Sequence, residues 1–430
     1  MWHHDRVIGW LFLLVSLVGA GFTYNAHRPR YAPAVVSGIS FFAGWLTSEL
    51  ALHHVAWQAL MTVGFVCLGA LRTGPGLAGL AVTLGSWVGL AALFWHGRDA
   101  EHAIEAALAD GLGADYLTRI PPEIRARFAP TIDWRPILLP LPVAGENVER
   151  VRNVPYGRAG ELDLRLDVVR HRDHPTGCPV LVYVHGGGWV VGSKNEQGLP
   201  LLFNLAARGW LGVSVDYRLS PHATFPDHLI DVKRALAWVR AHAAEYGGDP
   251  NFVVLAGGSA GGHLAALAAL TAADVEYQPG FEDVDTSVQG CVAFYGVYDF
   301  TDREGHWPHA GLLRLLERHV MKASLADARA AFERASPLHR VHDAAPPFLV
   351  VHGDRDTLVP VAQARHFAES LRTAGAAPVV YAEIAGAQHA FEIFPSLRTA
   401  FVVQGVERFL GYLYGRYVAS GAAAARAAAS

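Results

Sequence analysis

The sequence predicts an α/β fold with a doubly wound, mostly parallel sheet, preceded by an N-terminal helical transmembrane domain. Three observations carry this prediction. Apolar stretches dominate the first 96 residues, short β-rich runs alternate with helical stretches after residue 150, and Gly-containing turns follow several of these runs. The hydrophobic fraction of 52% is high for a soluble protein, and the excess lies in the first part.

Four apolar stretches in the first part predict four transmembrane helices. They are Val7–Phe22, Ala34–Leu50, Val55–Leu71 and Leu77–Trp95. Each is close to the minimum of roughly 17 residues for crossing a hydrocarbon core, and the turn between the second and third must be very tight. Three spans with one interfacial or re-entrant segment is therefore the alternative. A signal peptide is disfavoured because no small-residue cleavage site follows the first stretch cleanly.

Arginines near the spans predict the orientation of this multi-pass cell-membrane protein. Four spans place both termini, and the domain that follows, on one side of the membrane. The connections that face the other side carry Arg28, Arg30 and Arg72, whereas the domain side has Arg6 and Arg98. The positive-inside rule then predicts an extracytoplasmic domain.

Beyond the membrane domain, residues 1–97, the chain divides into three further parts. Residues 98–150 are expected to be a connector or part of a cap, because repeated prolines prevent long regular elements. Residues 151–415 should form the α/β domain. The Ala-rich end, residues 416–430, has too little to bury and is expected to be a flexible tail.

Near-continuous apolar runs predict the strands of the α/β domain, since parallel strands are buried on both faces. The runs are Val180–Val184, Leu211–Val215, Phe252–Ala256, Val288–Phe294, Phe348–Val351 and Val379–Ile384. Helical stretches between them cover Asp227–Tyr246, Ala260–Ala272 and Val361–Ala374, and Thr301–Ala335 predicts a helical cap. Strands that alternate with helices in this way form a doubly wound sheet.

Charge and cysteine content exclude several classes of function. The formal net charge of −4 and the absence of any Lys/Arg run in the sequence argue against nucleic-acid binding. Cys67, Cys178 and Cys291 lie far apart without metal-ligand spacing, so neither a disulfide framework nor a zinc site is indicated. No metal or organic cofactor is expected.

Ser259 is the candidate nucleophile. It lies in the segment Gly257–Gly261, which follows a predicted strand and opens an Ala/Leu-rich helix. Glycines two positions before and after the serine allow the sharp reversal that projects its hydroxyl above the sheet. The pattern alone also fits a Gly-rich turn, but its place between strand and helix favours the nucleophile.

Two loops after later strands supply candidate partners for Ser259. His389 follows the last strand and is the candidate base, and Asp356 follows the preceding strand and is the candidate acid that fixes its tautomer. Asp354 is expected instead to cap the turn or to pair with Arg355.

A glycine triplet follows the first predicted strand, in His185-Gly186-Gly187-Gly188-Trp189. Amides without side chains can approach a carbonyl and donate to the oxyanion that forms on attack. A flexible turn is the alternative explanation of the triplet. His185 is expected to order this loop rather than to transfer protons.

Six segments together resemble the hormone-sensitive-lipase-like branch of the α/β-hydrolases, over roughly residues 150–415. They are His185–Trp189, Asp216–Pro221, Gly247–Pro250, Gly257–Gly262, Tyr295–Asp299 and His352–Pro360. The resemblance implies an esterase or lipase whose oxyanion hole consists of the amides of Gly187, Gly188 and Ala260. Membrane-anchored lipolytic esterases of actinobacteria resemble the whole layout.

Two features depart from the pattern of this branch. Gly258 stands where many members carry Asp before the nucleophilic serine, so a hydrogen bond used there is not assumed here. A four-span membrane domain is also not typical of the branch.

The sequence therefore predicts a membrane-anchored carboxylic ester hydrolase that acts through an acyl-enzyme. Its expected partners are an acyl ester or lipid substrate and the bilayer. An amidase, peptidase or acyltransferase is an alternative, because His352–Pro360 also resembles acyl-peptide hydrolases, and a catalytically silent receptor or scaffold is another. The membrane part is expected to be dispensable for hydrolysis of short soluble esters.

Five further residues have two explanations each. Glu49 and His53 could form an intramembrane relay or metal pair, but their place at a turn favours an interfacial, structural role. Trp189, Trp307 and Phe391 could line an acyl pocket or belong to the packed core.

Overall fold

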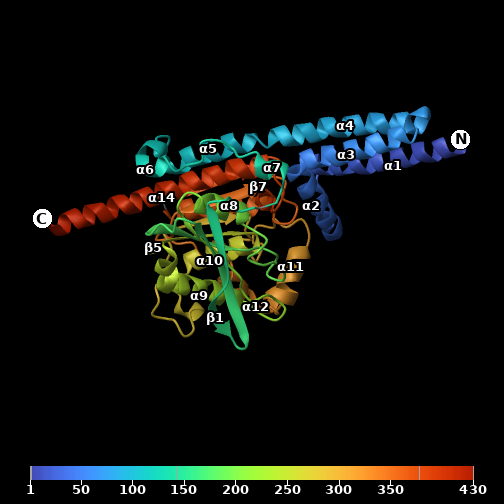
Figure 1. Cartoon of the computed structure of the whole chain (residues 1–430). Helices are drawn as coiled ribbons and strands as arrows, with labels where there is room; N and C mark the ends of the chain where they lie inside the picture. The colour runs from blue at the N-terminus through green and yellow to red at the C-terminus, as the bar shows by residue number, and fades with distance from the viewer. Residues whose placement is uncertain (1, 142, 377, 430) are drawn as a thin grey trace.

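An eight-stranded sheet forms the centre of the molecule (Figure 1). The computed structural model describes residues 2–141, 143–376 and 378–429. Strand order is β1-β2-β4-β3-β5-β6-β7-β8, and all pairs are parallel except β1 with β2 and β2 with β4. The strands are β1 Val148–Ala159, β2 Leu162–His171, β3 Cys178–Val184, β4 Leu211–Val215, β5 Gly248–Gly258, β6 Gly290–Phe294, β7 Phe348–Gly353 and β8 Val379–Ile384. The predicted mostly parallel sheet is confirmed.

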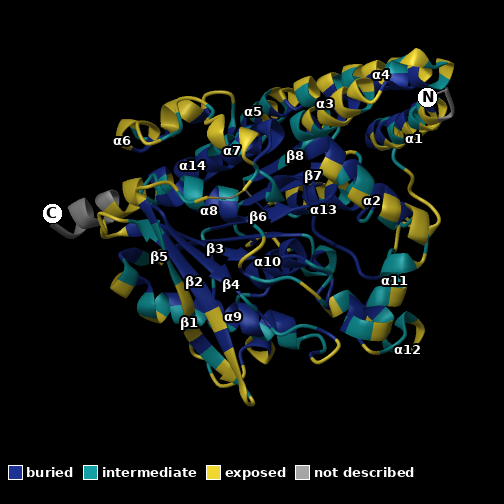
Figure 2. Cartoon of the chain, turned by 45° about the vertical axis from the view of Figure 1, so that its right-hand side comes forward, coloured by how far each residue is buried: buried dark blue, intermediate teal, exposed yellow. Residues whose placement is uncertain are grey.

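Helices cover both faces of this sheet, because side chains alternate along each strand and both faces are apolar. Val182 and Val350 belong to the core beneath α9 (Asp227–His242), α10 (Ala260–Leu270) and α13 (Val361–Thr373). Tyr183 and Val351 face the opposite core, beneath α5 (Asp99–Leu112), α8 (Leu199–Ala206) and α14 (Leu397–Ala429). Figure 2 shows the inner strands as a buried layer between these helices, whereas part of the β1–β2 hairpin is exposed.

A helical insertion separates β6 from β7, as the sequence predicted. It consists of α11 (Gly311–Leu315), the π-helical turn η5 (Leu316–Val320) and α12 (Leu325–Arg334). Short 3-10 turns elsewhere are η2 Tyr116–Arg119, η3 Ala243–Tyr246, η4 Val275–Tyr277, η6 Pro337–Arg340 and η7 Phe391–Ile393.

The predicted connector belongs to the outer layer of the domain, and the predicted tail is the far end of α14. Buried Ile104 and Leu108 pack α5 into the core beneath α14, and only the short helices α6 (Pro122–Arg125) and α7 (Arg135–Leu138) follow before β1. The tail, expected to be flexible, is helical because α14 continues to Ala429. Alanine has the highest helix propensity, so a segment with little to bury still continues a helix that is already anchored.

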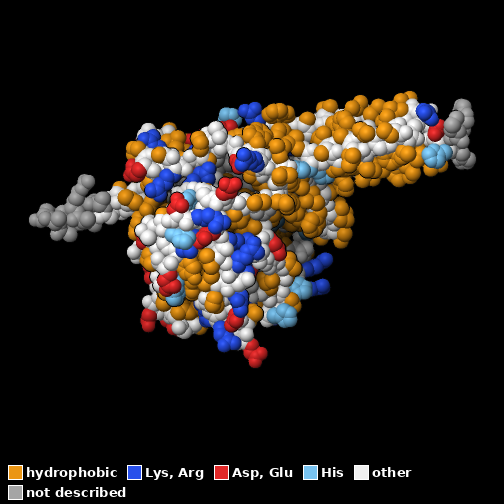
Figure 3. Space-filling view, viewed as in Figure 1, with side chains coloured by type: hydrophobic (Ala, Val, Ile, Leu, Met, Phe, Trp, Pro, Cys, Tyr) orange, Lys and Arg blue, Asp and Glu red, His pale blue; other side chains and the backbone are white. Residues whose placement is uncertain are grey.

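Three N-terminal helices form a bundle that projects from the domain, with the N-terminus at the far end (Figure 1). They are α1 (Trp2–His27), α3 (Ala51–Cys67) and α4 (Gly74–His96), and the 3-10 turn η1 (Ala70–Arg72) joins α3 to α4. Apolar side chains cover much of the visible surface of this bundle (Figure 3). Hydroxyls link α1 to α4 inside it: Thr83 donates to Ser16 at 2.9 Å, and Thr23 and Ser86 share a hydrogen bond of 2.8 Å.

Among the described residues, the structure contains fewer candidate spans than the four predicted. The stretches His4–His27 and Gly74–Leu112 are long and apolar enough to cross a membrane. The helices α2 (Ala34–Glu49) and α3 meet at 90° and together add at most one more. Two antiparallel spans would require a full reversal, and the single residue between these helices, Leu50, provides only a right-angle bend.

Candidate active site

Ser259 occupies a strained turn between β5 and α10. Its backbone has φ 58° and ψ −121°, a conformation that non-glycine residues rarely adopt. Steric clashes exclude any side chain at the two flanking glycines. A Cβ on Gly257 would lie 2.4 Å from the carbonyl oxygen of Gly261, and a Cβ on Gly261 would lie 2.0 Å from the carbonyl oxygen of Val184. The turn thereby holds the Ser259 hydroxyl at the carboxyl edge of the sheet.

The three candidate triad side chains meet at this edge. His389 Nε2 lies 2.8 Å from Ser259 Oγ, and His389 Nδ1 lies 2.6 Å from Asp356 Oδ2. Asp356 follows β7 and His389 follows β8, so neighbouring strands deliver both. A neutral imidazole in this position can take a proton from Ser259, and the carboxylate can stabilise the imidazolium that results.

Asp356 is held in its ionised form. Its Oδ1 accepts from the amides of Leu358 and Val359, each at 2.8 Å, and its Oδ2 also lies 3.0 Å from His352 Nε2. Burial alone would raise the pKa of Asp356, but the charges and hydrogen bonds of His389 and His352 hold it well below its usual range. The contact with His352 was not predicted from the sequence.

Asp354 contacts the loop after β8 at a different residue from Asp356. Its Oδ1 accepts from the amide of Gly386 at 2.7 Å, which ties the loop after β7 to the loop after β8. Burial raises the pKa of Asp354. Within the described residues it forms no hydrogen bond to His389, which agrees with the turn-capping role expected for it.

The loop of the predicted oxyanion glycines approaches Ser259, because a Cβ on Gly186 would lie 3.0 Å from the Cβ of Ser259. Gly187 and Gly188 have φ of 113° and 60°, and a Cβ on Gly187 would lie 2.0 Å from the carbonyl oxygen of Val191. Throughout the described parts of the chain, no acceptor is bonded to the amides of Gly187, Gly188 or Ala260. These donors are free for a substrate oxygen.

His185 orders the glycine loop, as expected. Its ring stacks on Tyr217 at a centroid distance of 4.4 Å, and its Nδ1 lies 2.7 Å from the carbonyl oxygen of Gly186. Burial lowers the pKa of His185, which favours the neutral ring.

A buried carboxylate occupies the space beside Gly258. Glu392 accepts hydrogen bonds from Tyr183 Oη at 2.9 Å and from Tyr295 Oη. A Cβ at Gly258 would lie 2.8 Å from Tyr295 Oη and 3.2 Å from Glu392 Oε1, so this cluster fills the room that an aspartate would need. The ring of Tyr295 lies 4.6 Å from that of His389, and burial raises the pKa of Glu392.

Helix α2 packs on both loops that carry the triad partners of Ser259. Trp45 Nε1 donates to the carbonyl oxygen of Ala390 at 2.8 Å, and the ring of Phe41 meets that of His389 edge-on at 6.0 Å. Ser37 Oγ donates to the carbonyl oxygen of Thr357 at 2.5 Å. The segment predicted to be the second span therefore packs against the candidate active site. The expectation that the membrane part is dispensable for chemistry stays a prediction, and these contacts provide a way to test it.

A buried ion pair fixes the end of α2 to the catalytic domain. Arg398 donates to Glu49, and Ser396 Oγ donates to the other carboxylate oxygen of Glu49 at 2.7 Å. His53 Nε2 lies 3.0 Å from the carbonyl oxygen of Leu138. Both residues thus make structural contacts at the turn, the explanation that the sequence favoured.

Among the aromatic candidates for an acyl pocket, two are core residues. Trp189 is buried and donates from Nε1 to His263 Nδ1 at 3.2 Å, and buried Phe391 packs edge-on against Tyr295. Trp307 is half-buried and packs against the core beneath α9, α10 and α13.

No group of three or more His, Cys, Asp or Glu residues in the described segments has the arrangement of a metal site. The three cysteines are free thiols. The hydrogen bonds around Ser259 connect the groups that nucleophilic catalysis with proton transfer through His389 would use.

Known proteins resemble this chain along most of its length. Residues 166–371 match the family described as BD-FAE. The probable carboxylic ester hydrolase LipM of Mycobacterium tuberculosis is 42% identical over 416 residues, which are 96% of this chain and 95% of that protein. Esterase LipQ of the same organism is 40% identical over 386 residues, 88% of this chain and 85% of that protein. A structure of Thermogutta terrifontis esterase 2 phosphonylated by sarin has a TM-score of 0.50 and 28% identity, covering 56% of this chain and 86% of that one.

Proposed function

The chain belongs to the hormone-sensitive-lipase-like esterases of the α/β-hydrolase superfamily and is a carboxylic ester hydrolase, and from that premise we propose that Ser259, His389 and Asp356 form its catalytic triad. The observation that carries the proposal is the continuous hydrogen-bond chain from Ser259 Oγ through both ring nitrogens of His389 to Asp356. A silent receptor or scaffold would not need this chain or the free amides beside it.

The proposed reaction has two halves. Ser259 Oγ attacks the ester carbonyl while its proton passes to His389 Nε2, and Asp356 stabilises the imidazolium. The tetrahedral intermediate collapses when His389 returns the proton to the leaving alcohol, which gives an acyl-enzyme. Water then attacks the acyl carbon with His389 as base, and collapse releases the acid and restores Ser259. The amides of Gly187, Gly188 and Ala260 stabilise the oxyanion in both halves.

We further propose that the bundle of α1, α3 and α4 anchors the enzyme in a membrane. The 17 residues of α3 span about 25 Å at 1.5 Å per residue, close to the hydrocarbon thickness. The hydroxyl pairs between α1 and α4 are suited to helix association in lipid. Residues 1–97 then contain three crossings rather than four, with residues 98–429 as one catalytic unit.

Three crossings reverse the predicted orientation. The far end of the bundle holds both the N-terminus and the turn after α3, since Arg72 lies 3.9 Å from Asp5. Arg28, Arg30 and Arg98 then lie at the domain end, against Arg6 and Arg72 at the far end. The positive-inside rule applied to this count places the catalytic domain in the cytoplasm, opposite to the N-terminus.

Labelling with a fluorophosphonate tests the nucleophile, and a hydrolysis profile tests the reaction. The full chain in detergent should take up the label at Ser259 and hydrolyse esters in preference to the matching amides. A labelled chain that prefers amides would favour the amidase alternative, and a chain that neither labels nor hydrolyses would contradict the triad. Tags at the two ends of the chain should report opposite sides of the membrane, and tags on one side would contradict three crossings.

A further inference from the structure

Helix α2 has two different faces. Ser37, Phe41, Gly44 and Ser48 form a stripe that is buried against the rest of the protein. The opposite stripe, Val35, Ile39, Phe42 and Leu46, leaves 75%, 66%, 59% and 37% of each residue exposed. Both stripes follow the i, i+4, i+7, i+11 spacing of one helix face, so α2 presents a continuous apolar face away from the catalytic loops.

The orientation of α2 matches the surface of a bilayer. It lies where the bundle meets the domain and makes a 90° bend with α3 (Figure 1). Asn25 at the end of α1 fixes it there, donating to the carbonyl oxygen of Ser40 at 2.8 Å and accepting from Ser40 Oγ at 2.7 Å. If α1 and α3 cross the membrane, a helix perpendicular to them lies in the plane of the interface.

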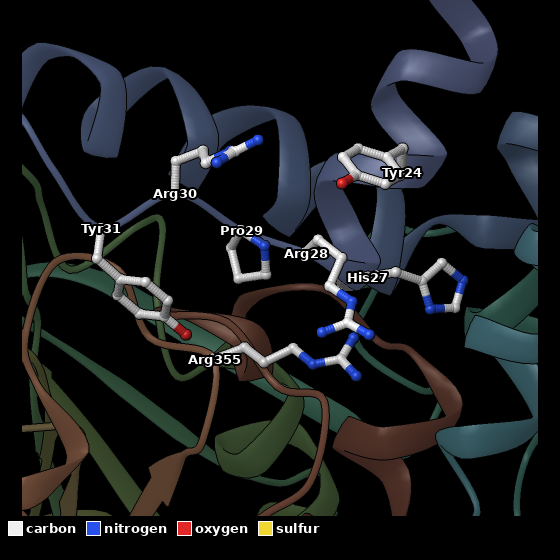
Figure 4. A pocket seen from close by; sticks show the side chains of 7 residues that line it. All are labelled: Tyr24, His27, Arg28, Pro29, Arg30, Tyr31 and Arg355. Carbon is white, nitrogen blue, oxygen red and sulfur yellow. The ribbon is translucent and has the colours of Figure 1, made fainter.

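An arginine corner lies at the start of α2. A cavity of about 690 Å³ is lined there by Tyr24, His27, Arg28, Pro29, Arg30, Tyr31 and Arg355. The guanidinium groups of Arg28 and Arg355 lie close together in Figure 4, and Arg30 points away from them. In the described part of the chain no carboxylate pairs with these arginines, and nearby Asp354 is bonded to Gly386. Arg355 Nη1 donates to the carbonyl oxygen of Ala26 at 3.0 Å. Guanidinium groups without a carboxylate partner and with neighbouring tyrosines, at the end of a proposed span, suit the phosphates of lipid head groups.

We propose that the exposed stripe of α2 and the arginine corner form one docking surface for a phospholipid bilayer with anionic head groups. The inference rests on the proposed function. The stripe is continuous with the apolar surface of the bundle (Figure 3), which identifies lipid rather than a soluble protein as its occupant. An apolar face that inserts shallowly and a basic cluster that binds phosphate are the two signals that together hold a helix in the interface.

This surface also defines the substrate class. Ser37, Phe41 and Trp45 of α2 contact the loops that carry Asp356 and His389, so in the proposed docking this single helix lies between the triad and the lipid. A docked α2 sets the active site against the head groups. The substrate is then an amphiphilic ester that enters from the bilayer, with its acyl chain in lipid until its carbonyl reaches Ser259.

Substitutions on the exposed stripe test the docking. The full chain and the variant Ile39→Gln/Phe42→Gln are reconstituted in vesicles of phosphatidylcholine with phosphatidylglycerol. Hydrolysis is measured for a short soluble ester and for a long-chain ester embedded in the same vesicles. The variant should lose about tenfold on the embedded ester and stay within about twofold of the parent on the soluble one. Leu162→Gln/Val275→Gln, two exposed apolar residues on the catalytic domain, is the matched control and should change neither rate.

Either of two results would overturn the stripe's role. Equal losses on both esters would make α2 a wall of the active site only, and an unchanged rate on the embedded ester would show that the stripe does not dock. Failure of the proposed function is distinguishable, because the parent chain would then hydrolyse neither ester.

Lipid composition tests the arginine corner. The parent should act several-fold faster on the embedded ester when phosphatidylglycerol is present, and Arg28→Gln/Arg30→Gln should lose this stimulation while matching the parent in phosphatidylcholine alone. The exposed Arg152, changed to Gln, is the control. Stimulation that persists in the variant would overturn the assignment. So would stimulation abolished by millimolar inorganic phosphate at constant ionic strength, since the corner would then be a site for free phosphate.

Discussion

The catalytic domain and the N-terminal helices were both predicted from hydrophobic patterns, with different success. In the catalytic domain every predicted strand overlaps an observed one, because each apolar run is bounded by turns that fix where it begins and ends. In the N-terminal part the hydrophobic pattern located the helices but did not show which of their faces pack against the protein. Phe41 and Phe42 are adjacent and equally apolar, yet Phe41 packs on His389 and Phe42 is 59% exposed. Hydropathy shows that a residue avoids water and does not distinguish lipid from a protein partner.

The largest expected effect concerns the catalytic domain alone. Ser259→Ala should lower kcat for ester hydrolysis by on the order of a million-fold, because loss of a triad nucleophile removes the covalent route. Thermal unfolding of the variant, measured beside the parent, checks that the fold is retained. A variant within about tenfold of the parent would show that another residue attacks.

The next effect distinguishes two carboxylates of one loop. Asp356→Asn should lower kcat by about 10⁴-fold, because the amide no longer fixes the tautomer of His389. Asp354→Asn should cost less than about tenfold, since Asp354 bonds Gly386 instead. Steady-state kinetics on one soluble ester compares the two, and equal or reversed losses would reassign the acid.

A smaller effect tests whether the N-terminal part contributes to chemistry. In detergent, Phe41→Ala should reduce kcat/KM for a soluble ester by about tenfold, because His389 loses the ring that packs against it. Phe42→Ala is the matched control and should stay within about twofold. If both variants equal the parent, the membrane part is dispensable, as the sequence analysis expected.

The smallest effect concerns the dependence of stability on pH. The unfolded chain releases the proton of Glu392 near pH 4.5, whereas burial keeps it on the folded chain to higher pH. The folded state therefore loses stability as pH rises from about 4.5 to the raised pKa, by at most about 1.4 kcal/mol per pH unit. Glu392→Gln should remove this loss. The free energy of unfolding of the variant should therefore rise relative to that of the parent as the pH increases from about 4.5 to the raised pKa. Urea titrations at several pH values measure the gain, and parallel pH curves would show that Glu392 is ionised in the folded protein.

The part of the candidate site that depends on local structure could be predicted from the sequence. Ser259, Asp356 and His389 each follow the end of a strand, so chain order and turns were enough to bring them together. The remaining contacts depend on segments distant in the chain: Trp45 and Ala390 are 345 residues apart. The role of Glu392, three residues after His389, was not evident from the sequence, because its partner Tyr183 lies in β3 and its partner Tyr295 directly follows β6. The roles of the triad residues stay predictions until they are measured.

The hairpin of β1 and β2 was missed for a related reason. Its strands carry many charged residues, such as Arg150, Glu149 and Arg170, which form ion pairs along the edge of the sheet instead of an apolar run. Near-continuous apolar runs identify strands that are buried on both faces, and they do not identify two strands rich in charged residues.

The ion pair between Glu49 and Arg398 has a kinetic consequence for an enzyme held at a bilayer. Together with α5, which packs into the domain directly after α4, it leaves no flexible tether between anchor and active site. If the proposed anchor holds the enzyme in a membrane, the active site stays at one height and tilt above the lipid, and embedded substrates reach it by lateral diffusion. Turnover of an embedded ester should accordingly follow its mole fraction among the lipids rather than its amount per volume of solution. Dilution with inert lipid would slow the enzyme, and dilution with buffer would not.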